Sequence, residues 1–226
     1  MKVYILAVTD AAYGDYCIAG MTEEGEWIRP IPNDAGNRFW TVNQLTIDKE
    51  HGFLRVGDVI EINGKKPIKF QHENHIEDFS VSGNMTFLER LSNTELLRFL
   101  KGKEETQQTF NNTVNAAGRS ICMVKVDGFQ HEITKFQGEA AKPKMIFSKE
   151  AFSVTNPKTI PGNYIVKDCK WSRLVLNQSV SNSIAYDEIY LVIGLATKWG
   201  DNNTEYPQVI GLHTEPEVLS LSTYPK

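Results

Sequence analysis

Short runs of β-branched and aromatic residues, separated by Gly, Asp and Glu turns, recur along most of the chain. Runs of this kind predict strands, because branched and aromatic side chains fit a pleated, half-buried surface. In the first half they predict strands at residues 2–8, 16–21, 27–31, 59–62 and 67–71. The last of these begins with Pro67, so it is expected at a sheet edge.

The second half repeats this pattern. It predicts strands at residues 121–126, 129–136, 144–148, 164–167, 171–176, 189–196 and 209–212. The Asp127-Gly128 dipeptide between the first two runs is typical of a hairpin turn. A chain in which strands are joined by short turns is expected to be mainly β.

One segment predicts a helix. Ser92 and Glu95 have the spacing of a capping box, apolar residues follow at helical spacing, and Gly102 is a typical stop. Residues 103–120 are polar and without a sustained period, which indicates a long connection and the boundary between two halves. The prediction is two small β-barrels of the oligonucleotide-binding (OB) type, at 1–110 with helix 92–101 and at 111–226.

Composition narrows the class of protein. A chain of 226 residues with 41% hydrophobic and 23% charged residues is typical of a globular protein. No apolar run approaches the roughly 20 residues of a membrane helix, so a cytoplasmic protein without a membrane partner is expected. Three widely spaced cysteines fit neither a disulfide framework nor a zinc site, and no cofactor or metal is indicated.

Charge is unevenly distributed. The net charge is −4, and residues 1–110 carry 12 basic against 17 acidic side chains. Residues 119–173, in contrast, carry ten basic against five acidic. If nucleic acid binds, the positive field is expected from this central part of the chain.

The first candidate site lies in Trp27-Ile28-Arg29-Pro30. In an extended chain Trp27 and Arg29 project from the same face and place an aromatic plane beside a guanidinium, a pair that suits a nucleotide ring. Alternatively, Trp27 packs under the barrel and Arg29 pairs with a nearby glutamate.

A second candidate interleaves cations with an aromatic side chain: Lys167, Lys170, Trp171 and Arg173. If this segment is extended, three of the four share a face and form a groove that tracks phosphates and stacks a base. The alternative is a solvated edge strand whose lysines discourage pairing with another sheet. Trp199 lies where a predicted strand gives way to a loop, and it either holds a ligand or closes the end of the barrel. The remaining basic candidates for phosphate contact, or else plain surface charge, are Arg119, Lys142 and Lys144.

The sequence gives weaker evidence for catalysis than for ligand binding. His72 and His75 are three residues apart and could share a metal ion, but the zinc-protease pattern needs a spacing of four on a helix. A third ligand would have to come from His51, His131 or an acid elsewhere. Nucleophile motifs and glycine-rich phosphate loops are missing from the sequence.

Several segments together resemble a known family: Cys17-Ile18-Ala19-Gly20, Trp27 to Ile31, Val56 to Ile62, Gln71 to Asn74 and Ser120 to Val126. They are similar to the bacterial proteins with a dual OB-containing domain, and the resemblance covers nearly the whole chain. It implies an OB-type barrel in each half and, by analogy of fold, binding of nucleic acid or a nucleotide.

The sequence therefore favours a non-enzymatic module that binds single-stranded nucleic acid or a nucleotide. Because the isoelectric point is about 5.8, a long nucleic-acid strand is expected to bind weakly. A small nucleotide is therefore the other ligand expected. The alternatives are a protein-interaction or sensor domain beside a separate effector, and a metal-dependent hydrolase that uses His72 and His75.

Overall fold

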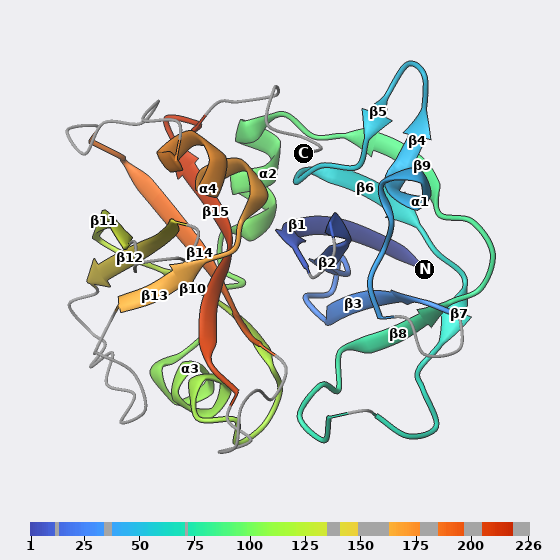
Figure 1. Ribbon diagram of the computed structural model, residues 1–226, viewed down its shortest axis with the longest axis horizontal. Coiled ribbons are helices and arrows are strands. Elements are labelled where there is room, and N and C mark those ends of the chain that lie inside the picture. The colour runs from blue at the N-terminus through green and yellow to red at the C-terminus, as the bar shows by residue number, and fades with distance from the viewer. Residues whose placement is uncertain are drawn as a thin grey trace.

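The computed structural model describes residues 1–11, 14–33, 38–70, 72–134, 141–148, 163–176, 185–196 and 205–218. It is mainly β, as predicted, and Figure 1 shows two curled β-rich halves side by side. The described residues also form four helices, α1 (Val42–Leu45), α2 (Asn93–Leu100), α3 (Gln107–Val114) and α4 (Cys169–Leu176). None of these helices is long or apolar enough to cross a membrane.

The first sheet belongs to the first half and has the strand order β7-β8-β3-β2-β1-β6-β9. Its strands are β1 (Lys2–Asp10), β2 (Tyr16–Met21), β3 (Trp27–Pro32), β6 (Asp58–Glu61), β7 (Gly64–Lys65), β8 (Asp78–Val81) and β9 (Thr86–Arg90). Only β3 and β8 pair in parallel within this sheet, and their register sets Arg29 opposite Asp78. A separate small ribbon joins β4 (Thr46–Asp48) to β5 (Gly52–Phe53).

The second sheet has the order β10-β14-β15-β13-β12-β11. Its strands are β10 (Ile121–Lys125), β11 (Gly128–Thr134), β12 (Lys142–Ser148), β13 (Asn163–Val166), β14 (Glu188–Leu195) and β15 (Pro207–Glu215). Strands β13 and β15 are parallel, and the other pairs are antiparallel. Strands β10, β14 and β15 contribute side chains to the core shared with the first half.

Each half has its own hydrophobic core, and a third cluster is built from both. The shared core takes Leu6, Met21 and Trp27 from the first sheet and Met123 and Val192 from the second. Helix α2 packs its buried leucines, Leu96, Leu97 and Leu100, into the same cluster. The two halves are therefore held together by buried apolar surface.

Strand β15 lies directly against β1 at this junction. A Cβ atom at Gly211 would fall 2.4 Å from the Leu6 carbonyl oxygen, so only glycine permits the approach. Thr9 forms a β-bridge with Asp168, and the Arg173 guanidinium donates to the Asp10 carboxylate at 3.1 Å. Backbone and side-chain contacts thus join the halves in addition to the shared core.

The capping box predicted for α2 is confirmed. Ser92 Oγ accepts from the Glu95 backbone N–H, and the Ser92 backbone N–H donates to Glu95 Oε2 at 2.8 Å. The prediction of a single helix is wrong, because α3 lies within the segment expected to be a polar connection. The proposed boundary between residues 110 and 111 falls inside α3, whose Phe110 and Val114 pack into the core of the second half.

Two predicted strands are also wrong. Residues 171–176 belong to helix α4, because Asp168 caps its first turn by accepting from the Trp171 backbone N–H at 2.6 Å. Residues 67–70 are irregular, and the strand that pairs with Gly64–Lys65 is β8.

Candidate functional site

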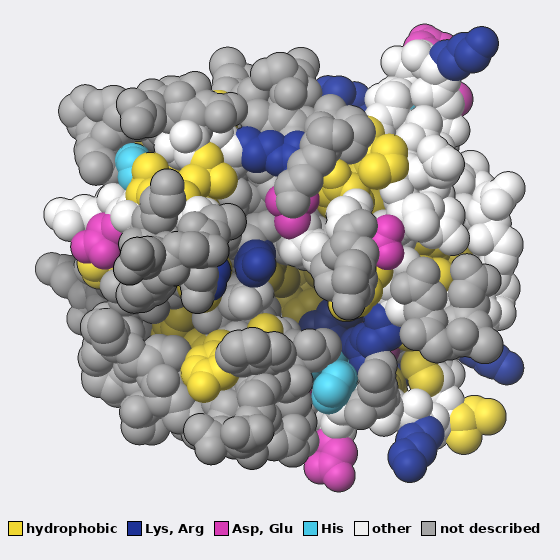
Figure 2. Space-filling model, in the orientation of Figure 1, with side chains coloured by type: hydrophobic (Ala, Val, Ile, Leu, Met, Phe, Trp, Pro, Cys, Tyr) yellow, Lys and Arg dark blue, Asp and Glu magenta, His cyan; other side chains and the backbone are white. Residues whose placement is uncertain are grey.

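A cavity of about 720 Å³ opens where the two halves meet. We call it the seam cavity, and strands of both sheets contribute to its walls. Figure 2 shows basic side chains and a histidine gathered near the middle of one face of the molecule. The lining comprises Ala7, Thr9, Asp10, Ala11, Cys17, Ile18, Ala19, Arg29, Arg38, Phe39, His75, Ile165, Lys167, Gly194, Leu195, Ala196, Tyr206, Gln208 and Ile210.

Two guanidinium groups share one carboxylate at the edge of this cavity. The parallel register of β3 and β8 places Asp78 beside Arg29, whose Nη1 donates to Asp78 Oδ1 at 3.0 Å. Arg38 donates to the other oxygen of the same carboxylate, Oδ2, at 2.8 Å. All three side chains are largely buried, so the pairs are poorly screened by solvent.

His75 completes the cluster as an acceptor. Arg29 Nη1 lies 2.7 Å and Arg38 Nη2 3.1 Å from His75 Nδ1. Because arginine only donates, Nδ1 must accept and the neutral ring carries its proton on Nε2. Burial and the two neighbouring guanidinium charges lower the pKa of His75 to about 2. The imidazole therefore adds no positive charge at neutral pH.

Arg29 is also fixed from the second half. Its Nη2 donates to Ser120 Oγ at 2.6 Å, and Ser120 Oγ in turn donates to Glu77 Oε2 at 3.0 Å. Glu77 Oε1 accepts from the backbone N–H groups of Ser120 and Ile121 at 2.8 and 3.1 Å. The Arg29 side chain is thus held in one orientation by hydrogen bonds across the junction.

The charges of the lining do not cancel. Arg29 and Arg38 face one carboxylate, that of Asp78, and Asp10 is paired with Arg173. Lys167 makes no ion pair with any residue that the structure describes. Cys17 stays a neutral thiol, because burial raises its pKa to about 11. Lys167 is therefore the cation of the lining that can attract an anion without giving up an ion pair with a described residue.

The rest of the lining is apolar or aromatic. Aliphatic side chains of Ile18, Ile165 and Ile210 line the walls, and the rings of Phe39 and Tyr206 lie among the lining residues. Tyr206 is partly exposed. A flat ring can be buried against such walls while a charged group reaches the cations. The cavity thus suits a ligand with one aromatic end and one anionic end.

The two histidines considered as metal ligands in the hydrolase alternative lie close together. The rings of His72 and His75 have centroids 4.7 Å apart, and Glu205 Oε1 lies 3.8 Å from His72 Nδ1 and 3.7 Å from His75 Nε2. Glu205 Oε2 accepts from the Asn74 amide at 2.6 Å. Within the described part of the chain, no three His, Cys, Asp or Glu side chains are placed to hold a metal ion.

Two of the ten predicted site residues, Arg29 and Lys167, meet in the seam cavity. Arg29 pairs with Asp78 rather than with a nearby glutamate. Trp27 is 3% exposed, packs in the shared core and donates from Nε1 to Glu105 Oε1 at 3.3 Å. It therefore follows the packing alternative. Arg119 is also tied to Glu105 by an ion pair.

The extended segment expected for the second candidate site is wrong. Trp171 lies on α4 with no exposed surface, and its ring contacts Phe129 and His131 edge to face at centroid distances of 5.3 and 5.6 Å. On the same helix, Lys170 Nζ lies 3.9 Å from a Glu217 oxygen, and Arg173 binds Asp10. Because Trp171 and Arg173 lie on a helix, the extended face predicted for them together with Lys167 does not form.

The other basic candidates lie elsewhere. Lys142 and Lys144 are on β12, where they alternate with the buried Pro143 and Met145 and so point away from the core of the second half. They are not part of the seam cavity lining. Trp199 lies outside the described residues.

Sequence reasoning missed four residues that complete the site, namely Arg38, Phe39, Asp78 and Tyr206, and considered His75 only as a metal ligand. Most of them lie in connections, where no period of two or 3.6 residues marks which way a side chain points. Among these residues, Asp78 was the most predictable from the sequence, because an acid at the start of a buried strand needs a cationic partner.

Comparison with known proteins agrees with this architecture. A family model described as a dual OB-containing domain matches residues 1–212. No curated protein and no solved structure gives a match.

Proposed function

Because the chain belongs to the dual OB-containing domain family, we propose that it is a binding module whose seam cavity holds a nucleotide, either free or within single-stranded nucleic acid. One observation carries the proposal. The ammonium of Lys167, the guanidinium groups of Arg29 and Arg38, two aromatic rings and aliphatic walls meet in one cavity of about 720 Å³, within the usual volume range for small-molecule sites.

Charge favours a ligand with few phosphate groups. A phosphate monoester carries about 1.5 to 2 negative charges at neutral pH. Lys167, which has no ion pair with a described residue, suits one such group, while Arg29 and Arg38 already bind Asp78. A triphosphate would bring more charge than the lining offsets. A nucleoside monophosphate, or one nucleotide of a strand, is therefore the best-matched ligand.

The contribution of each basic residue differs. The guanidinium groups of Arg29 and Arg38 are positioned by Asp78 and His75, so they supply a fixed field at the cavity edge. Lys167 is half-buried and unpaired among the described residues, so its ammonium can reach a phosphate oxygen without breaking an existing contact. Lys167 is thus the side chain to test first.

Calorimetric titration with nucleoside monophosphates and a short single strand, at about 50 and about 200 mM salt, tests the proposal. Lys167→Gln is expected to weaken binding about tenfold, the value of one charge-assisted hydrogen bond. The matched control is Lys144→Gln, on β12 outside the cavity, which should bind as the unaltered protein does.

Equal losses in Lys167→Gln and Lys144→Gln would mean that diffuse charge, not the cavity, attracts the ligand. If neither mononucleotides nor single strands bind, the proposal is wrong and a protein partner becomes the better explanation of the fold.

A further inference from the structure

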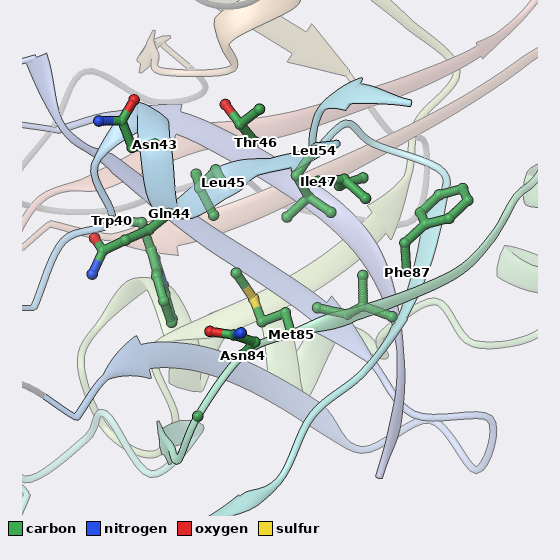
Figure 3. A pocket seen from close by; sticks show the side chains of 12 residues that line it. Trp40, Asn43, Gln44, Leu45, Thr46, Ile47, Leu54, Asn84, Met85 and Phe87 are labelled. Atoms are coloured by element: carbon green, nitrogen blue, oxygen red, sulfur yellow. The ribbon is translucent and has the colours of Figure 1, made fainter. Parts of the chain in front are cut away.

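A second cavity, of about 470 Å³, lies within the first half. We call it the neutral pocket, and Figure 3 shows its side chains arranged around Met85. It is built by α1, β4, Leu54, β6, and β9 with the turn that precedes it. The lining comprises Trp40, Asn43, Gln44, Leu45, Thr46, Ile47, Leu54, Ile60, Gly83, Asn84, Met85 and Phe87.

Among the described residues, this lining holds no Lys, Arg, Asp, Glu or His. A charged group bound there would lose water without gaining a partner, which is costly. The pocket therefore excludes phosphates, carboxylates and ammonium groups. In this respect it is the opposite of the seam cavity.

Amide groups supply hydrogen-bonding capacity at the rim. The side chains of Asn43 and Asn84 are exposed and make no hydrogen bond with any other described residue. Gln44 Oε1 already accepts from the Thr41 N–H at 2.9 Å, which leaves the Gln44 amino group as a donor. Asn84 lies beside Met85 at the edge of the pocket (Figure 3). Together these amides offer both donors and acceptors to a ligand.

The frame around these amides is fixed. Trp40 Nε1 donates to the Pro30 carbonyl oxygen at 2.8 Å, and two backbone hydrogen bonds of 2.8 Å join Trp40 to Tyr16. The capping box of Thr41 and Gln44 fixes the start of α1, and Leu54 N–H donates to the Leu45 carbonyl oxygen at 2.8 Å. A fixed frame lowers the entropy cost of binding.

The centre of the pocket is adaptable. Met85 points between Trp40 and Leu54 (Figure 3) and is half-buried. Methionine is unbranched and polarisable, so it can move aside and pack against an aromatic ring. Phe87 closes the far side of the pocket, where its ring packs against the His51 ring at a centroid distance of 4.3 Å.

From this chemistry we propose that the neutral pocket binds an uncharged heteroaromatic ring of nucleoside size, whose edge carries both donors and acceptors. Its volume lies within the range of small-ligand sites. Asn and Gln amides pair with base edges in this manner, and the apolar floor buries the face of the ring. The proposal does not depend on what the seam cavity binds.

The five methionines provide a direct test, because each gives one methyl signal after isotope labelling. Adenosine, guanosine, cytidine and uridine are titrated separately into the whole protein, with the Met85 signal assigned from Met85→Leu. Saturable shifts are expected at Met85. Met21, Met123 and Met145 are buried in other clusters and should stay unchanged.

Asn84→Ala should weaken the binding of at least one nucleoside about three- to tenfold, the value of one or two neutral hydrogen bonds. Asn63→Ala, also exposed but outside the lining, is the matched control. Lys167→Gln, which alters the seam cavity, should leave the Met85 titration unchanged. A failure of nucleotide binding in the seam cavity can therefore be told apart from a failure of nucleoside binding in the neutral pocket.

No saturable Met85 shift with any nucleoside would overturn the proposal. The same holds if a neutral peptide such as N-acetyl-phenylalaninamide shifts Met85 while the nucleosides do not, since the pocket would then recognise peptide. Equal weakening by Asn84→Ala and Asn63→Ala would also contradict it.

Discussion

The seam cavity and the neutral pocket lie on opposite sides of one short segment of backbone. Arg38 and Phe39 line the first, and Trp40, the next residue, lines the second. The seam cavity draws on both halves and contains ionisable groups, whereas the described lining of the neutral pocket comes from the first half and contains none. The same chain therefore carries one site selected for charge and one selected against it.

The difference shows what each kind of site needs from the fold. Buried guanidinium groups need carboxylate and hydroxyl partners, and here these come from β8 and from Ser120 of the second half. Amides at an exposed rim need no such partners, so a pocket made of neighbouring segments is sufficient. A charged site thus depends on distant contacts, and a neutral one can form locally.

The largest expected effect comes from removing the shared carboxylate. Asp78→Ala leaves Arg29 and Arg38 buried without their counter-ion, which should cost about 3–5 kcal/mol of unfolding free energy. Asn84→Ala in the neutral pocket should change stability by no more than about 0.5 kcal/mol. Urea denaturation of both variants measures the contrast, and similar small losses in the two would refute it.

The second-largest expected effect is a loss of folding stability at acidic pH, caused by the buried His75 of the seam cavity. The folded-state pKa of His75, about 2, lies below the unfolded value of about 6.5, so its contribution is complete above the unfolded value. That contribution is lost as pH falls, by up to about 1.4 kcal/mol per pH unit. His213, with a pKa lowered to about 3 by burial, acts in the same direction, while the raised pKa of Asp168, about 6, opposes both between pH 6 and 4.

His75→Gln keeps an acceptor for the guanidinium groups but cannot titrate. The loss of stability between about pH 7 and about pH 5 should therefore be about 2 kcal/mol smaller in this variant than in the unaltered protein. His51→Gln, at a half-exposed histidine of the first half, is the control. An unchanged pH dependence in His75→Gln would show that His75 is not held neutral by the fold.

The smallest expected difference between the two cavities is in how their ligand affinities respond to salt. Nucleotide affinity in the seam cavity is expected to fall several-fold between about 50 and about 200 mM salt, because charged contacts are screened. Nucleoside affinity in the neutral pocket should not change, since no charged side chain lines it. Equal salt dependence at the two sites would contradict the claim that charge contributes to binding in the seam cavity alone.

Much of the fold was predictable because its signals are local. The capping box at Ser92 and the strand from Tyr16 to Met21 were predicted with the bounds that the structure shows. Helix α4 was missed because Trp171 and Val175 favour strands, although Asp168 three residues before Trp171 was a valid helix start. In α3 the polar residues obscured the spacing of the buried residues Phe110, Thr113 and Val114.

The site was less predictable because long-range pairing assembles it. Arg29 was found from its place beside Trp27, yet its partners Asp78 and Ser120 are 49 and 91 residues away. The pairing of β3 with β8 in parallel decides the first contact, and docking of the halves decides the second. No local sequence pattern around Arg38 predicts that its side chain reaches the Asp78 carboxylate.

The core shared by the two halves has a consequence for how the chain could be divided. Cut after α2, at the turn that contains Gly102, the first piece would carry Leu6, Met21 and Trp27, and the second Met123 and Val192. Each piece would expose an apolar face complementary to the other, and each would hold part of the seam cavity. A seam ligand would then act as a molecular glue that promotes the reassembly of the split protein.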